Sequence, residues 1–244
     1  MRFERASGIL LHPSSLPGPY GIGDLGPGAH RWLEFLAACG CKYWQILPLG
    51  PTGYGDSPYQ CFSAFAGNPY LISPDALAQD DLLSPQDLEV LPDFPGSQVD
   101  FGGVIPWKLS LLDRSFVIFE RSAIPALRRA YTAFREKHAD WLEDFALFMA
   151  LKEAHGGASW TSWEPPLRER RPDALSQARR ELEEPIRRQL FRQFAFFRQW
   201  EDVHAHASRL GIQIIGDVPI FIAHDSSDVW SHPDLFFLDK NGSP

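Results

Sequence analysis

Three short apolar runs, each followed by a loop rich in glycine and proline, are the feature that most constrains the fold of this chain. They are ILL at 9–11, KYWQILPL at 42–49 and IQII at 212–215. Residues 26–40 lie between the first two runs, and their apolar side chains recur at helical spacing until Gly40. The order strand, helix, strand with short links is typical of a βαβ unit, so the runs predict buried strands of a parallel sheet covered by helices.

A long helical stretch separates the second run from the third. Proline-led helix starts occur at Ser73-Pro74 and Ser84-Pro85, followed by acidic residues that suit the positive end of a helix dipole. From about residue 107 to residue 210 the pattern is almost continuously helical, with breaks at HGGASW and WEPPLRER. We therefore expect an α/β fold with a large helical insertion after the second strand, on the side of the sheet where α/β proteins carry their sites.

Composition excludes several classes of function. The formal net charge of -8 disfavours nucleic acid as a partner, because nucleic-acid affinity needs a basic footprint. The three cysteines are odd in number and predict free thiols in a reducing compartment. The first residues contain only a short apolar core, and no stretch approaches the roughly 20 apolar residues of a membrane span, so we expect a cytoplasmic protein without a membrane partner.

The three loops after the apolar runs carry the groups that bind polyols. They occupy residues 12–26, 50–60 and 216–230, and each combines hydroxyls and carboxylates with an aromatic ring. Loops that follow parallel strands converge on one edge of the sheet. Carboxylates and amides bind sugar hydroxyls, while aromatic faces pack against the apolar side of a sugar ring. The loops therefore predict a carbohydrate-binding site.

Three long motifs identify a family resemblance. Residues 10–26, 50–72 and 214–230 closely resemble the amylomaltase family of 4-α-glucanotransferases, glycoside hydrolase family 77. The resemblance implies a (β/α)8 TIM barrel, present here as an incomplete barrel of about three strands. It also implies transfer of α-1,4-glucan segments between maltooligosaccharides or glucose by a retaining double displacement, without metal or organic cofactor. Residues 1–72 and 208–244 are then expected to form the partial barrel, and residues 73–207 the helical insertion.

The resemblance also assigns roles to individual residues. Asp217 matches the aspartate that supports the catalytic centre at the end of the third barrel strand. Tyr59 matches a tyrosine that stacks on the sugar beside the scissile bond, and Ser57 lies next to it. Tyr54 matches an aromatic residue of a second, distal glucan groove. That groove has another tyrosine in relatives, where this chain reads VDFG with Phe101, so stacking is expected to survive and the phenolic hydrogen bond to be lost.

The catalytic pair of a retaining glycosidase is not found in this sequence. Such enzymes place a carboxylate nucleophile and a carboxylic acid about 5 Å apart. The resemblance puts these on the fourth and fifth strands and a third essential aspartate on the seventh, whereas only three strands precede the final DKNGSP. We therefore expect an amino-terminal fragment that is inactive alone and marginally stable, because its sheet edge is open. The alternative is a non-catalytic carbohydrate-binding piece or an inert truncated remnant.

Several polar residues also have plain structural explanations. For Asp217 the alternative to a functional role is capping of the turn or helix that follows it, and for Asp56 the favoured interpretation is an Asx-turn residue. The segment 225–228 (DSSD) lacks the spacing of a calcium loop and predicts a helix cap instead. His204 and His206 point to different faces of a helix, so they do not predict a shared metal site.

Overall fold

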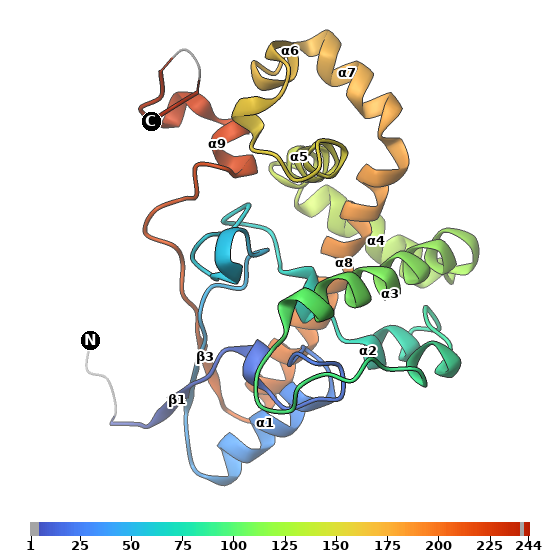
Figure 1. The fold of residues 1–244 in the computed structure, drawn as a ribbon. Coiled ribbons are helices and arrows are strands. Elements are labelled where there is room, and N and C mark those ends of the chain that lie inside the picture. The colour runs from blue at the N-terminus through green and yellow to red at the C-terminus, as the bar shows by residue number, and fades with distance from the viewer. Residues whose placement is uncertain (1–4, 240–241) are drawn as a thin grey trace. The chain divides into compact units, whose positions relative to one another are not determined.

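The computed structural model describes residues 5–239 and 242–244 and divides the chain into two compact units (Figure 1). The first unit comprises Met1–Leu49, Asn68–Pro125 and Ala195–Val218. The second comprises Gly50–Gly67, Ala126–Phe194 and Pro219–Pro244. The boundaries of these units differ from those of the partial barrel and the helical insertion expected from the sequence. The division into barrel and insertion stays a prediction.

The first unit is built on a three-stranded parallel sheet. Its strands are β1 (Gly8–Leu10), β2 (Tyr43–Gln45) and β3 (Gln213–Ile215), in the order β1-β2-β3. Helix α1 (Pro27–Ala38) connects β1 to β2, as the βαβ pattern predicts. The long helical stretch leads from β2 to β3, which pair directly. The α/β fold, the parallel sheet and the position of the helical stretch are therefore confirmed.

The two faces of the sheet differ in burial. Ile9, Trp44 and Ile214 are in register across the strands, and Trp44 at the centre is completely buried. The next row contains Leu10 and Ile215, which are 53% and 44% exposed. Side chains of a strand alternate between faces, so one row packs on the helices while the other faces away from them. The prediction of buried strands is wrong for that second row.

Helices form most of the remaining structure. The first unit also contains α2 (Pro74–Gln79) and α3 (Phe101–Ser122). Helix α8 (Glu183–Arg209) passes through both units. The second unit contains α4 (Pro125–Lys137) from its second residue on, α5 (Leu142–Ala154), α6 (Pro165–Arg168), α7 (Pro172–Glu181) and α9 (Ser227–Ser231). Short 3-10 helices occupy Pro13–Ser15, Tyr54–Asp56, Pro69–Leu71, Pro85–Leu88, Trp160–Ser162 and Pro233–Leu235.

The proline-led helix starts are confirmed. Ser73 is the N-cap residue of α2. Ser84 begins the 3-10 helix Pro85–Leu88 with a capping box, in which Asp87 Oδ2 accepts hydrogen bonds from the Ser84 backbone N–H at 2.9 Å and from its hydroxyl at 2.7 Å. The helical stretch starts earlier than residue 107, at Phe101, because Asp100 takes the N-cap position of α3. The predicted breaks at 155–160 and 163–170 are also present, although the second break contains the one-turn helix α6.

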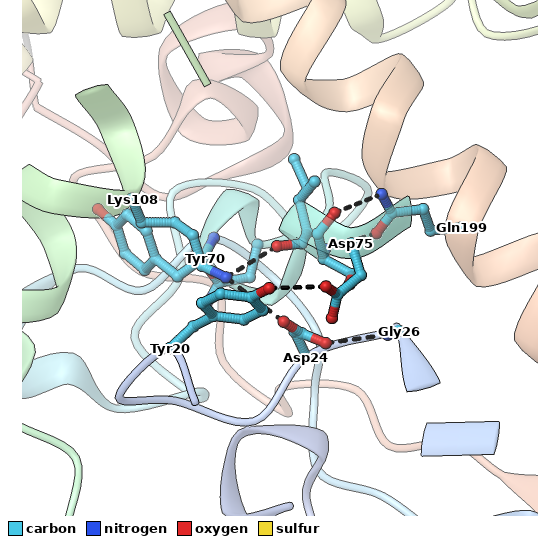
Figure 2. A network of polar contacts seen from close by, with 10 residues as sticks. Tyr20, Asp24, Gly26, Tyr70, Asp75, Lys108 and Gln199 are labelled. Atoms are coloured by element: carbon cyan, nitrogen blue, oxygen red, sulfur yellow. Dashed lines mark hydrogen bonds and ion pairs between the residues drawn. The ribbon is translucent and has the colours of Figure 1, made fainter. Parts of the chain in front are cut away.

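A buried lysine links α3 to the first motif loop (Figure 2). The Lys108 side chain is 1% exposed; its ammonium lies 3.6 Å from Asp24 Oδ2 and donates to the carbonyl oxygen of Ile72 at 2.9 Å. Asp24 Oδ1 in turn accepts a hydrogen bond from the Gly26 N–H at 3.0 Å. Burial lowers the pKa of Lys108 and raises the pKa of Asp24, and the ion pair opposes both changes.

Three more side chains, Tyr20, Asp75 and Gln199, extend this network. The Tyr20 hydroxyl donates to Asp75 Oδ1 at 2.6 Å, so the first motif loop is bonded to the first turn of α2. Gln199 of α8 accepts from the Ser73 N–H at 2.7 Å and donates to the Ser73 carbonyl at 3.2 Å (Figure 2). Both peptide groups of a buried, irregular residue are thereby satisfied. The network fixes the segment 69–75 between α3 and α8.

We predict that Lys108→Met destabilises the protein by about 3–5 kcal/mol, because it leaves Asp24 buried without a counter-charge. Urea unfolding followed by circular dichroism measures the effect. Lys42→Met at an exposed lysine of the same unit is the control and should stay within about 0.5 kcal/mol of the parent. In the double variant Asp24→Asn/Lys108→Met part of the loss should return; a double variant no more stable than Lys108→Met would contradict the charge argument.

Candidate functional site

The second motif loop, residues 50–60, is closed by backbone hydrogen bonds between its two ends. Thr52 and Cys61 form an isolated antiparallel bridge, and the Phe62 N–H donates to the carbonyl of Pro51 at 3.0 Å. Inside the loop, the Gly53 N–H donates to the carbonyl of Gln60 at 2.7 Å. A compact surface loop with close ends is a common carrier of function. The loop therefore presents its tip, residues 54–59, in a defined conformation.

Two glycines are needed for this conformation. A Cβ atom at Gly53 would lie 2.8 Å from the carbonyl oxygen of Gln60, so no side chain fits there. Gly55 has φ of 67°, in the left-handed region that side chains disfavour. Asp56 shares this region with φ of 52°, which agrees with its interpretation as a turn residue. The glycine spacing of the motif thus reflects backbone geometry.

The predicted sugar-binding residues of this loop lie at its tip. Tyr54 begins the 3-10 helix Tyr54–Asp56. Tyr59 is 41% exposed, and its N–H donates to the Ser57 hydroxyl at 3.3 Å. Ser57 is half-buried. The structure brings Ser57 and Tyr59 together, and it leaves a large part of the Tyr59 side chain accessible to a ligand.

The third motif segment is bonded to the second. Asp228 accepts hydrogen bonds from the Ser63 hydroxyl at 3.0 Å and from the Ala64 N–H at 2.7 Å. The Ser227 N–H donates to the carbonyl of Phe62 at 2.8 Å. Ser226 caps α9 by accepting from the Val229 N–H at 3.3 Å, which confirms the helix-cap prediction for the segment 225–228. The two motifs therefore meet at residues 62–64 and 226–228.

A second buried lysine reaches both motif segments. Lys152 of α5 has a side chain that is 7% exposed and binds Asp225 Oδ2 at 2.6 Å. Its ammonium also donates to the carbonyl of Ala158 at 3.3 Å and lies 4.9 Å from the centre of the Phe62 ring. Charge-assisted hydrogen bonds of this length are among the stronger ones in proteins. Lys152 thus contacts the second motif through Phe62 and the third through Asp225.

A glutamine holds the end of the second motif. Gln193 is 1% exposed, and its side chain accepts from the Gly67 N–H at 2.7 Å and donates to the Gly67 carbonyl at 2.9 Å. The side-chain amide of this α8 residue therefore satisfies both peptide groups of Gly67. This is the arrangement that Gln199 makes with Ser73 in the first unit.

The other two predicted site residues belong to the first unit. Asp217 follows β3, is exposed, and its Oδ1 accepts a hydrogen bond from the Val218 N–H at 2.8 Å. This contact agrees with the capping interpretation and leaves the supporting catalytic role as a prediction. Phe101 is half-buried at the first position of α3. The roles of Tyr54, Ser57, Tyr59, Phe101 and Asp217 all stay predictions.

His12 anchors the first motif loop. Its Nδ1 accepts from the Ser14 N–H at 3.2 Å and lies 2.7 Å from the Ser14 hydroxyl, while Nε2 is 3.3 Å from the carbonyl of Pro48. An accepting Nδ1 and an Nε2 beside a carbonyl fit the neutral ring with its proton on Nε2. Burial lowers the pKa of His12, and the bond to Pro48 partly opposes this.

Sequence reasoning missed the buried residues that hold the loops. The helical pattern predicts the helices that contain Lys108 and Lys152 but does not by itself distinguish these two residues from exposed lysines. Each of them lies in the apolar stripe of its helix. Lys108 lies four residues after Val104 and three before Leu111, and Lys152 lies four after Phe148. All three of these apolar neighbours are buried. A lone lysine at a stripe position is the signal that predicts a buried partner.

The described residues form no metal-binding cluster and no membrane-spanning helix. Among residues 5–239 and 242–244, no three His, Cys, Asp or Glu side chains lie close enough together to hold a metal ion. Within the same residues, every helix is too short or too polar to span a bilayer. Cys39, Cys41 and Cys61 are free thiols, as predicted. Burial and the nearby Asp228 carboxylate raise the pKa of Cys61, which keeps this thiol protonated at neutral pH.

Comparison with known families accounts for the three motifs. The profile of the family described as 4-alpha-glucanotransferase, glycoside hydrolase family 77, matches residues 11–244. The chain belongs to this family. A 4-alpha-glucanotransferase of Thermus thermophilus is 54% identical over 244 residues, which cover 100% of this chain and 48% of the relative. One from Synechocystis is 47% identical and is matched over 97% of this chain and 47% of its own length.

Solved structures of the family have the same fold over this length. The amylomaltase from Streptococcus agalactiae, solved in complex with acarbose, has a TM-score of 0.94 at 38% identity and covers 99% of this chain and 48% of its own. The amylomaltase from Corynebacterium glutamicum has a TM-score of 0.75 at 18% identity, a similarity of fold. The chain thus spans about half the length of the family members it matches most extensively.

We predict that the stability of the protein falls in part through His12 as the pH drops below about 6.5. Its pKa is lower in the folded than in the unfolded state, so the unfolded state binds more protons as the pH falls below 6.5. His12→Asn keeps a side-chain acceptor for the Ser14 N–H but does not titrate. Urea unfolding at pH 7 and pH 5 should therefore give a smaller loss in this variant, and an equal loss would contradict the assignment.

Proposed function

We propose that this chain supplies part of the substrate site of a 4-α-glucanotransferase, which transfers α-1,4-glucan segments between maltooligosaccharides or glucose. The observation that carries the proposal is the closed second motif loop, tied to the third motif by Asp228 and presenting an exposed Tyr59. Family membership and the acarbose complex of the Streptococcus agalactiae amylomaltase support carbohydrate as the ligand. Nucleic acid and membranes are not proposed as partners.

Each predicted residue has a distinct role in this proposal. The flat face of Tyr59 stacks on a sugar ring beside the bond to be cleaved, and the Ser57 hydroxyl binds a sugar hydroxyl. Tyr54 and Phe101 serve a second, distal glucan groove. Phenylalanine keeps the apolar face that stacking needs, whereas the hydrogen bond of a tyrosine hydroxyl is lost. Asp217 supports the catalytic centre without attacking the substrate.

We further propose that the sheet is the start of a (β/α)8 barrel, to which 1–72 and 208–244 contribute and into which 73–207 is inserted. The exposed row of Leu10, Gln45 and Ile215 supports this. In such a barrel one face of every strand packs on the surrounding helices and the other faces a filled interior. Leu10 and Ile215 have the apolar character that an interior layer requires.

The transfer reaction needs two catalytic groups that are not proposed for this chain. Retention by double displacement needs a nucleophile and an acid/base, both carboxylic acids about 5 Å apart. No residue described above is proposed for either role, and the 244-residue chain is expected to release no glucose from maltotriose. Binding without transfer would instead describe a carbohydrate-binding piece, which is the second candidate function. This second function is favoured because four of the five proposed residues, all except Asp217, are assigned to sugar binding.

We predict that the 244-residue chain binds maltoheptaose and that Tyr59→Ala weakens this binding roughly tenfold, about 1.4 kcal/mol, through loss of the stacking face. Isothermal titration calorimetry measures both constants. Phe65→Ala is the control, since Phe65 is another exposed aromatic residue of the same unit, 58% exposed, outside the predicted site. Equal binding by the parent and Tyr59→Ala would refute the role of Tyr59.

We also predict that activity appears when this chain is followed by the remaining half of the Thermus thermophilus relative. The fused protein should disproportionate maltotriose, with glucose release as the assay. Asp217→Asn in the fused protein should lower kcat by at least about a hundredfold, because it removes the charge of a supporting carboxylate. A fused protein that folds but shows no transfer would count against the proposed activity.

A further inference from the structure

We propose that Lys152 is a positioning residue for the sugar-binding loop, and that maltooligosaccharide affinity depends on it although it lies outside that loop. The proposal rests on the proposed function, since it concerns the loop that carries Tyr54, Ser57 and Tyr59. It begins from the fact that this loop, although its backbone hydrogen bonds fix its shape, buries little apolar surface that could fix its position. From Gly50 to Gln60 only Pro51 has a buried side chain among the residues for which burial is described.

The loop must therefore be held from its base. Residues 61–64 follow the tip directly, and here burial is high: Cys61 and Ser63 are almost completely buried. Three contacts bind this base to the third motif, namely Asp228 to Ser63, Asp228 to Ala64 and Ser227 to Phe62. The position of the loop thus depends on the position of the segment 225–228.

Lys152 decides where that segment lies. Its ammonium binds Asp225 at 2.6 Å, three residues before Asp228, while Asp225 Oδ1 accepts from the Trp160 N–H at 3.3 Å. The carboxylate is therefore fixed from two sides, by α5 and by the start of the helix Trp160–Ser162. Because a buried ammonium needs a counter-charge, Asp225 cannot leave without a large cost in free energy.

The same ammonium acts on the loop base directly. It lies 4.9 Å from the centre of the Phe62 ring, in the geometry of a cation–π contact, and 5.9 Å from the Phe148 ring of its own helix. One cation therefore contacts both partners of the junction, Phe62 of the second motif and Asp225 of the third. A methionine in its place keeps apolar contact with the rings but has no attraction for the carboxylate.

The test compares maltoheptaose binding by the 244-residue parent, Lys152→Met and Lys152→Arg in isothermal titration calorimetry. Lys152→Met is expected to raise Kd at least tenfold, whereas Lys152→Arg keeps the charge and should restore Kd to within about threefold of the parent. Lys137→Met, at an exposed lysine of α4 in the same unit, is the matched control and should bind as the parent does.

Hydrogen exchange separates positioning from general destabilisation. In Lys152→Met the amides of Ala64 and Ser227 should lose protection, while the Leu11 and Ile46 amides of the sheet keep theirs. If Lys152→Met does not fold, Asp225→Asn removes the same ion pair at constant size and should likewise lower protection at the Ala64 and Ser227 amides and raise Kd.

The outcomes distinguish this inference from the proposed function. A parent chain that binds no maltoheptaose overturns the sugar-binding site and the role of Lys152 with it. A parent that binds, together with Lys152→Met of unchanged Kd, overturns the role of Lys152 alone. Equal loss of protection in the sheet and in the loop would also overturn it, because the lysine would then serve overall stability only.

Discussion

A lysine ammonium taken out of water is stable only where a carboxylate and further acceptors meet it, and each unit of this protein depends on one such group. In the first unit Lys108 meets Asp24 and the carbonyl of Ile72. In the second Lys152 meets Asp225 and the carbonyl of Ala158. In both cases the lysine comes from the helical stretch and the aspartate from a motif loop, so helical residues hold the loops in place.

This arrangement gives the helical stretch a role beyond filling space between two strands. Loops rich in glycine and proline have little apolar surface with which to fix themselves, and irregular backbone must still satisfy its peptide groups. Here the helices supply the missing groups: an ammonium for Asp24 and for Asp225, and a glutamine side chain for Gly67 and for Ser73. The tip of the second motif can then stay exposed, as a binding surface requires, while residues 62–64 at its base are hydrogen-bonded to Ser227 and Asp228.

The sequence predicts the elements better than the contacts. Apolar runs, Ser-Pro starts and the helix cap at Ser226 depend on neighbours along the chain, so the strands, α2 and α9 were predictable. The exposure of Leu10 and Ile215 was not, because an apolar run does not reveal which face of a strand is covered. The partners of Lys152 lie 73 residues away at Asp225 and, across the junction, at Phe62; only the position of the lysine in an apolar stripe hints at them.

The two glutamines of α8 have a consequence for which substitutions this chain can accept. Gln193 and Gln199 bind Gly67 and Ser73 through peptide groups alone, as a neighbouring strand would do. These hydrogen bonds do not involve the side chain of Gly67 or Ser73. They therefore require a glutamine in the helix but no particular side chain at the residue it binds. Loss of Gln193 would leave both the N–H and the carbonyl of Gly67 without this partner. Loss of Gln199 would leave the Ser73 N–H without one, while the Ser73 carbonyl would still accept from the Leu77 N–H.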